Sequence, residues 1–304
     1  MGLAASQPTT NLWRMIDDSD TAQHPADALA GASFPLPATV PVPIHGGPAA
    51  AIFAAWTALG RDSGVLGEQT GDLTLCRDGV GFFQTFAHGA IYWTPQTGAH
   101  EVHGAIRELW ASLGWERGFL GYPLTDEAST SDAQGKGRVS TFQGGAIIYV
   151  PDTGAHAIHG AIPDTLEYDW PSITFGDGVA AGGRTHLTLS RDGSCHFTGA
   201  MHDSGAAAYN YSVAGAVKDV GNQAYTFGHT GNIAGTFESG SRDDPWDINS
   251  TNPTVAQNWL SLVAAADGDP HASWSSTVST DLGALIGAVV ATVGTVAGVV
   301  ALFV

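Results

Sequence analysis

One phrase appears twice in this 304-residue chain, and it constrains the fold more than any other feature. The two copies start 56 residues apart, at Gly89 and Gly145, and read GAIYWTPQTGAHEVHGAI and GAIIYVPDTGAHAIHGAI. Upstream, a Trp and two Leu-Gly pairs recur 54 residues apart, as Trp56 and Trp110 show. Self-similarity at a fixed period indicates a repeated supersecondary unit. The chain is therefore predicted to hold two complete copies and a fragment that begins at His159.

Each copy is predicted to contain a short helix followed by strands. In the first copy Ile52, Trp56 and Leu59 fall on one helical face, and the pattern ends at a Gly suited to a left-handed C-cap. The later runs are β-branched or aromatic and bounded by Gly and Pro, as is typical of strands. These runs are 82–86 and 90–93 in the first copy and 139–142 and 146–150 in the second. Residues 44–162 are therefore predicted to be a repeat-built, mainly β domain.

The rest of the chain divides by composition into an arm, two linkers and a second β domain. Residues 1–43 are rich in Pro and are predicted to be an extended arm, with a short helix near residues 12–16. Residues 173–266 are predicted to be an antiparallel sandwich or barrel with a terminal helix, flanked by linkers at 163–172 and 267–281.

A hairpin is the clearest element of this second domain. A three-residue loop, Arg191-Asp192-Gly193, is predicted to set Leu187 opposite Phe197 and Leu189 opposite Cys195. His186, Thr188, His196 and Thr198 would then share the other face. Asn252-Pro253 is a good start for the terminal helix, because Asn caps helices well and Pro suits the first position.

The last segment, residues 282–304, carries no charge. As one helix its 23 residues, at about 1.5 Å each, would cover roughly the 30 Å hydrocarbon core of a bilayer. Gly283, Gly287, Gly294 and Gly298 would form one stripe that lets another backbone approach closely. A glycine-striped hydrophobic helix that inserts in a membrane or self-associates is predicted.

Charge and cysteine content restrict the partners. The net charge is −18 with only 11 basic residues, so nucleic acid is excluded as a partner, whereas neutral ligands such as sugars suit the chain. Cys76 and Cys195 lie in different predicted domains and are interpreted as small buried hydrophobic residues. No cofactor fingerprint is found, and the first residues, MGLAASQPTTNLWRMIDDSD, lack the pattern of a secretory signal.

Several motifs resemble one known family. LGYP at 120–123, its degenerate copy LGEQ at 66–69, FQGGAIIY at 142–149 and the two TGAH motifs are similar to LGFP repeats. The resemblance covers about residues 44–162. It implies a propeller-like arrangement of β units in an actinobacterial cell-envelope protein that holds cell-wall polysaccharide. The first copy departs from the pattern, with Glu68 and Gln69 in place of the aromatic residue and the proline.

Sugar binding requires an aromatic face for the C–H side of a sugar ring, with hydrogen-bonding groups beside it. Trp93 and Tyr149 occupy equivalent positions in the two copies. The candidate carbohydrate-binding residues are Trp93, Tyr149, Tyr92, His100, His156 and Gln143. The alternative is structural: aromatic residues pack between the units, and each His after Thr-Gly-Ala fixes a turn by hydrogen bonding.

Metal and catalytic motifs are weaker. The HxxH pairs, His100 with His103 and His156 with His159, lack a third zinc ligand of fixed spacing. The acidic segment RDDPWDIN at 242–249 is interpreted as a solvated loop, and GAMHDSG at 199–205 as a polar turn. No metal site or catalytic residue is assigned.

The leading hypothesis is a non-catalytic, envelope-associated glycan-binding protein that is anchored or oligomerised through residues 282–304. One alternative is a pore-forming or self-assembling effector that uses the glycine-striped helix. A second alternative is a hydrolase that uses His202, Asp203 or another histidine of the second domain.

Overall fold

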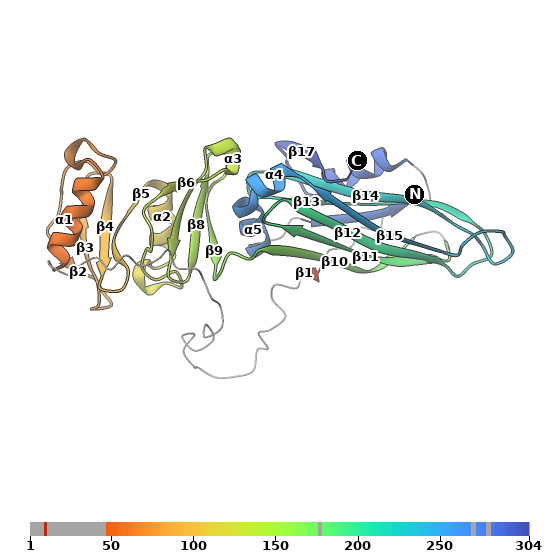
Figure 1. The fold of residues 1–304 in the computed structure, drawn as a ribbon, viewed down its shortest axis with the longest axis horizontal. Helices are drawn as coiled ribbons and strands as arrows, with labels where there is room; N and C mark the ends of the chain where they lie inside the picture. Colours follow the sequence, from red (N-terminus) through yellow and green to blue (C-terminus); the bar gives the residue numbers. More distant parts are fainter. Residues whose placement is uncertain (1–8, 11–46, 176–177, 269–271, 278–280, 304) are drawn as a thin grey trace, which may run out of the picture. The chain divides into compact units, whose positions relative to one another are not determined.

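The structure, a computed structural model, describes residues 9–10, 47–175, 178–268, 272–277 and 281–303 (Figure 1). The chain divides into two compact units, Asp17–Ile162 and Met1–Ile16 with Pro163–Val304. We call the first the repeat unit and the second the sandwich unit. The predicted arm, residues 1–43, and its short helix lie outside the described residues, apart from strand β1 (Thr9–Thr10).

The repeat unit contains two modules, each with a helix, a 3-10 turn and a four-stranded sheet. The first module comprises α1 (Pro48–Ala58), η2 (Arg61–Ser63), β2 (Thr74–Leu75), β3 (Phe82–Thr85), β4 (Gly89–Thr94) and β5 (Gly98–His103). The second comprises α2 (Gly104–Ser112), η3 (Trp115–Arg117), β6 (Ala128–Ser129), α3 (Asp132–Gly135), β7 (Arg138–Phe142), β8 (Gly145–Val150) and β9 (Gly154–His159). Both sheets are antiparallel with the strands in chain order, which confirms the predicted repeat of helix and strands.

Helices and sheets alternate along the repeat unit (Figure 1). Helix α1 packs on one face of the first sheet through Ile52 and Trp56. Helix α2 lies between the two sheets, where the Trp110 ring is 4.7 Å from the Tyr92 ring of the first sheet and 5.5 Å from the Phe142 ring of the second. Propeller blades surround a central channel. The two described modules stack through a helix, and the propeller-like arrangement that the resemblance implied stays a prediction.

The recurring Trp and Leu-Gly residues hold the chain after each helix in place. Trp56 Nε1 donates a hydrogen bond to the Gly67 carbonyl oxygen at 3.0 Å, and Trp110 Nε1 donates to the Gly121 carbonyl oxygen at 3.1 Å. A buried indole N–H needs a partner, so each Trp fixes the Leu-Gly turn that leads into its own sheet. This repeated bond explains why the spacing of 54 residues is kept.

The sandwich unit is built from two sheets. Its elements after β1 are β10 (Thr165–Thr174), β11 (Ala181–Ser190), β12 (Ser194–Asp203), β13 (Tyr209–Lys218), β14 (Gln223–Ile233), β15 (Asp243–Thr251), α4 (Pro253–Gln257), α5 (Trp259–Asp267), β16 (Ala272–Thr277), α6 (Leu282–Thr292) and β17 (Gly298–Ala301). One sheet has the order β1-β10-β11-β12-β15 and the other β16-β13-β14-β17, with β17 parallel to β14.

The two sheets pack face to face through aromatic side chains. The Phe227 ring of β14 lies 5.1 Å from the Phe197 ring of β12 and 5.5 Å from the Trp170 ring of β10. Of the two architectures that the sequence left open, the described strands form a sandwich, and no sheet closes into a barrel.

Local predictions for this unit are confirmed. Leu187 pairs with Phe197 and Leu189 with Cys195, and Gly193 of the loop has a φ of 91°. Asn252 caps the following helix by accepting a hydrogen bond from the Thr254 N–H at 2.9 Å. The helix is interrupted at Asn258 and continues as α5. Both cysteines are free and buried.

Both predicted linkers contain strands. Residues 163–172 form most of β10, in which Leu166, Tyr168 and Trp170 are buried in alternation. Residues 267–281 contain β16, which pairs with β13. The first linker was mispredicted although its alternation of apolar and polar residues is itself typical of a half-buried strand.

The C-terminal segment is not one helix. Helix α6 ends at Thr292, Gly294 takes a φ of 85°, and the chain then adds β17 to the sheet. Leu285 and Val289 of α6 pack on Ala214 and Ala216 of β13, whose small side chains leave room for a helix. These apolar side chains of α6 thus pack on the protein's own sheet. Among the described residues, no helix combines the length and apolarity needed to cross a membrane.

The predicted glycine stripe is also broken. Gly283 and Gly287 lie on the exposed side of α6, but Gly294 ends the helical segment and Gly298 belongs to β17. The four glycines would share a face only if the helix continued through all of them.

Candidate functional site

Trp93 and Tyr149 occupy matching places in the two sheets. Trp93 pairs with Ala99 across β4 and β5, and Tyr149 pairs with Ala155 across β8 and β9. Each ring is half-buried and packs at the border of the core beside the helix of its own module. Each ring is partly exposed, and on the other side Trp93 pairs with Phe82 of β3, whose ring lies 6.3 Å away.

Tyr92 is a core residue. Its side chain is 5% exposed, and its ring stacks on Phe83 at 5.3 Å and meets Trp110 edge-on. Burial raises the pKa of Tyr92 well above its usual value, which keeps the phenol protonated. The neighbouring position in the sequence, Trp93, faces the opposite side of the strand, which is why two adjacent candidates have different surroundings.

His100, His156 and Gln143 make hydrogen bonds that fix local turns. His100 Nε2 donates to the Thr97 carbonyl oxygen at 2.9 Å, and His156 Nε2 shares a hydrogen bond with Thr153 Oγ1 at 2.9 Å. Gln143 Oε1 accepts the Tyr122 N–H at 2.9 Å, which holds the LGYP turn. His100 Nδ1 also lies 3.2 Å from Asp126 Oδ1 of the second module, so the described contacts of these three side chains are those of the structural alternative.

The two histidines of each HxxH pair lie on opposite faces of a strand. Residues three apart on a strand alternate in side, so His100 and His103 point away from each other. His103 Nδ1 lies 2.7 Å from Glu101 Oε2, and His103 Nε2 lies 3.6 Å from Glu127 Oε2. A helical spacing would have placed the two imidazoles together, and the strand removes that possibility.

Glu101 links the two modules and was not singled out by the sequence analysis. It is 2% exposed, and its Oε1 accepts the Glu127 N–H at 2.9 Å. Asp126 Oδ1 in turn accepts the Glu101 N–H at 3.0 Å, so Asp126 and Glu127 lie along the edge of β5. The hydrogen bond with Glu101 raises the pKa of His103, and burial raises that of Glu127. The sequence does indicate that this position is unusual, because the first copy has Glu101 where the second copy has Ala157.

The outer face of the five-stranded sheet is polar. His186 Nδ1 lies 2.6 Å from Asp169 Oδ1, and His202 Nδ1 lies 2.8 Å from Asp243 Oδ1. The predicted histidine face of the hairpin is present, but the carboxylates that pair with it come from β10 and β15. The acidic segment 242–249, predicted as a loop, lies largely in strand β15, because its alternate residues Asp244, Trp246 and Ile248 face the interior of the sandwich.

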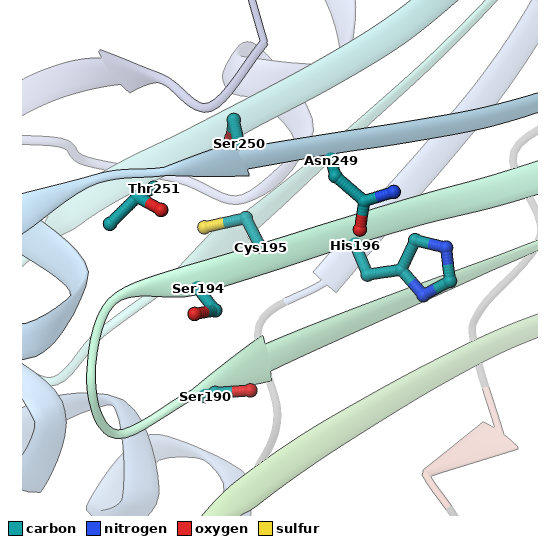
Figure 2. A pocket seen from close by; sticks show the side chains of 7 residues that line it. All are labelled: Ser190, Ser194, Cys195, His196, Asn249, Ser250 and Thr251. Carbon is teal, nitrogen blue, oxygen red and sulfur yellow. The ribbon is translucent and has the colours of Figure 1, made fainter.

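A shallow depression lies at one end of this face. Figure 2 shows the side chains around it, at the ends of β11, β12 and β15. Its volume is about 300 Å³. The residues that line it are Ser190, Ser194, Cys195, His196, Asn249, Ser250 and Thr251.

The catalytic reading of GAMHDSG finds no support in the geometry. His202 is exposed and pairs with Asp243, whereas Asp203 is fully buried, and Ser204 Oγ donates to the Ala180 carbonyl oxygen at 2.8 Å. The segment is the end of β12 in place of the predicted turn, so its successive side chains point to opposite faces of the sheet. The three side chains do not converge.

A second polar group lies inside the sandwich. Tyr211 Oη donates to Asp244 Oδ2 at 2.7 Å, and His229 Nε2 lies 3.2 Å from the same oxygen. The His229 ring stacks on Trp246 with 4.5 Å between centroids. Burial raises the pKa of Tyr211, so the phenol remains a hydrogen-bond donor that holds the carboxylate. These residues join strands β13, β14 and β15.

Comparison with known proteins agrees with the repeats. A family model described as LGFP repeat matches residues 66–118 and 120–168. Each match starts at or next to a Leu-Gly turn and runs through a sheet, so α1 lies outside the first match. A comparison with curated proteins finds no match. The resemblance drawn from LGYP and TGAH is confirmed, and the chain carries two LGFP repeats.

Proposed function

We propose that this chain is a non-catalytic glycan-binding protein of the cell envelope, and that its repeat unit holds cell-wall polysaccharide. The observation that carries the proposal is the matched placement of Trp93 and Tyr149. Each lies opposite an Ala in its sheet, half-buried, in a module that overlaps an LGFP repeat.

The chemistry of these two positions suits a neutral sugar polymer. An aromatic ring whose face is partly uncovered can pack against the C–H side of a sugar ring. The net charge of −18 disfavours a polyanion, whereas a neutral polysaccharide is not repelled. Two such rings on one chain also engage successive parts of the same polymer, and the second contact then benefits from a high effective concentration.

The test is retention of the full chain on purified cell wall and on a glycan array. Trp93→Ala and Tyr149→Ala should each weaken retention about tenfold, because a stacked ring contributes about 0.5–1.5 kcal/mol beyond the area it buries. Phe53→Ala is the matched control, since this ring is 51% exposed on α1 of the first module and has no proposed role. The proposal fails if the wild-type chain is not retained, or if the double variant is retained as well as the wild type.

Self-assembly through residues 282–304 is the alternative function that a specific observation favours. The exposed side of α6 carries only small residues at Gly283, Ala284, Gly287 and Ala291, which would let a second helix approach closely. Light scattering of the full chain and of Gly287→Leu tests it, together with leakage of dye from liposomes. A monomeric chain that causes no leakage would remove this alternative.

A further inference from the structure

We propose that the depression at the ends of β11, β12 and β15 binds one ring of a neutral, polyhydroxylated ligand, a sugar residue. It lies in the sandwich unit and nothing in the LGFP match, which ends at residue 168, accounts for it. This inference does not rest on the function proposed for the repeat unit.

Short side chains create the hollow. Ser194 pairs with Thr251 and His196 with Asn249, so these four side chains share the outer face of the sheet. Ser190, Ser194 and Thr251 have short side chains, whereas His196 and Asn249 have longer ones (Figure 2). Cys195 and Ser250 also line the depression, and they alternate with these residues along their strands, so their side chains turn inward.

One carboxylate orients the two larger side chains. Asp247 Oδ1 accepts hydrogen bonds from His196 Nε2 at 2.8 Å and from Asn249 Nδ2 at 3.1 Å. The donors of both side chains are thereby turned toward Asp247. His196 Nδ1 and Asn249 Oδ1 form no hydrogen bond with any residue that the structure describes, and both are free to accept one from a ligand. The wall is thus held in place before a ligand arrives, which lowers the entropy cost of binding.

The polar groups of the lining match hydroxyl groups. Serine and threonine hydroxyls both donate and accept, as do the hydroxyls of a sugar. In the described part of the chain, no hydrogen bond engages the side-chain hydroxyls of Ser190 and Thr251. Together with the two acceptors fixed by Asp247, they offer several mixed contacts to one polyhydroxylated ring.

Charge and size narrow the ligand further. None of the described residues that line the depression is a Lys or Arg, and the acidic neighbours Asp192 and Asp247 repel a phosphate or a carboxylate. The volume of about 300 Å³ is at the small end of ligand sites, which span roughly 300–1,000 Å³. These properties fit one neutral ring and do not fit a nucleotide or a large cofactor.

The experiment is a titration of the full, isotope-labelled chain with glucose, galactose, mannose and arabinose, followed by the amide shifts of Ser194, Asn249 and Thr251. At least one of these neutral sugars should shift these amides, and glucuronate should not. Asn249→Ala and Thr251→Val should each weaken the binding about fivefold, as expected for the loss of one neutral hydrogen bond. Ser239→Ala, an exposed serine elsewhere in the same unit, is the matched control.

The proposal is overturned if none of the four sugars shifts these amides, if glucuronate shifts them equally, or if both variants bind as the wild type does. Amide spectra of the variants establish that the sandwich unit is folded in each case. The double variant Trp93→Ala, Tyr149→Ala should leave these shifts unchanged. Loss of cell-wall retention with the shifts intact would therefore separate the repeat unit's function from this site.

Discussion

The tyrosine of LGYP connects the two modules through its hydroxyl group, and we predict that Tyr122→Phe destabilises the repeat unit. Tyr122 Oη donates to Asp78 Oδ2 at 2.7 Å and accepts the Gly81 N–H at 3.0 Å. Both partners belong to the preceding module. Tyr122 is 4% exposed and Gly81 is buried. Phenylalanine is the residue that the family name gives at this position, so the change that looks most conservative should be costly here.

The magnitude follows from what the hydroxyl leaves behind. Without it the buried Gly81 N–H loses its partner, at a cost of about 1–3 kcal/mol. The lost bond to Asp78 adds less, about 0.5–1 kcal/mol, because Asp78 is exposed and water replaces the phenol. The ring stays, so no large cavity forms. We expect a total loss of about 2–3 kcal/mol for Tyr122→Phe and about 1 kcal/mol for Asp78→Ala.

The assay is urea unfolding of the full chain, combined with hydrogen exchange of the Gly81 amide. The two units need not unfold together, so the shift should fall in the transition of the repeat unit alone. Tyr149→Phe is the control, because its hydroxyl forms no hydrogen bond with another described residue, and its effect should stay within about 0.5 kcal/mol. A Tyr122→Phe variant as stable as the wild type, with unchanged exchange at Gly81, would refute the reasoning.

Three further predictions concern other contacts. The pKa of His103 is raised, chiefly by its hydrogen bond with Glu101. The stability that protonated His103 contributes is therefore complete below about pH 6.5 and is lost as the pH rises through the pKa in the folded state. In thermal unfolding, His103→Gln should lower the stability more at about pH 6 than at about pH 9. Gly118→Ala should lower the free energy of unfolding by about 2 kcal/mol in urea, because the added Cβ would lie 2.0 Å from a backbone oxygen. Gly287→Ala has open space around the added Cβ and should instead stabilise α6 by about 0.5–1 kcal/mol. Lys218, 7% exposed, donates to a carbonyl after α6 at 3.4 Å, and Lys218→Met should speed amide exchange in β17 severalfold.

Features set by neighbouring residues could be predicted from the sequence. The register of the β11–β12 hairpin follows from one loop that needs a left-handed Gly193, and the start of α4 follows from the side chain of Asn252. The helix and strands of each repeat follow from periodicity and from glycine positions. Each of these depends on contacts within a few residues, where the pattern of side chains leaves few alternatives.

The C-terminal segment could not be predicted in this way, because hydropathy does not say which apolar surface will cover a segment. Its partner is β13, a strand buried on both faces, with Val213 and Val217 toward the other sheet and Ala214 and Ala216 toward α6. A strand that is apolar on both faces requires a covering layer on each side. That requirement was visible in the sequence of β13, whereas the segment 282–304 alone gave no sign of it.

The candidate site residues were harder to predict, because a repeated position has a structural role and a ligand role that look alike in sequence. His100 and His156 recur because each fixes the same turn, so recurrence by itself was no evidence of ligand contact. Conversely, Glu101 breaks the repeat, and it accepts a hydrogen bond from the Glu127 N–H of the next module. The departures from the repeat carried the information about specific contacts.

The contact between Tyr122 and Gly81 also explains why the first motif, LGEQ, lacks an aromatic residue. In the second copy the aromatic side chain fits against Gly81 of the preceding module, where a Cβ would lie only 2.6 Å from the tyrosine ring. The described residues contain no module before α1, so an aromatic residue in place of Glu68 would have no such loop to enter, and Glu68 and Gln69 are exposed. The differences at Glu68 and Gln69 therefore concern packing between modules, and they do not count against ligand contact at Trp93 in the first module.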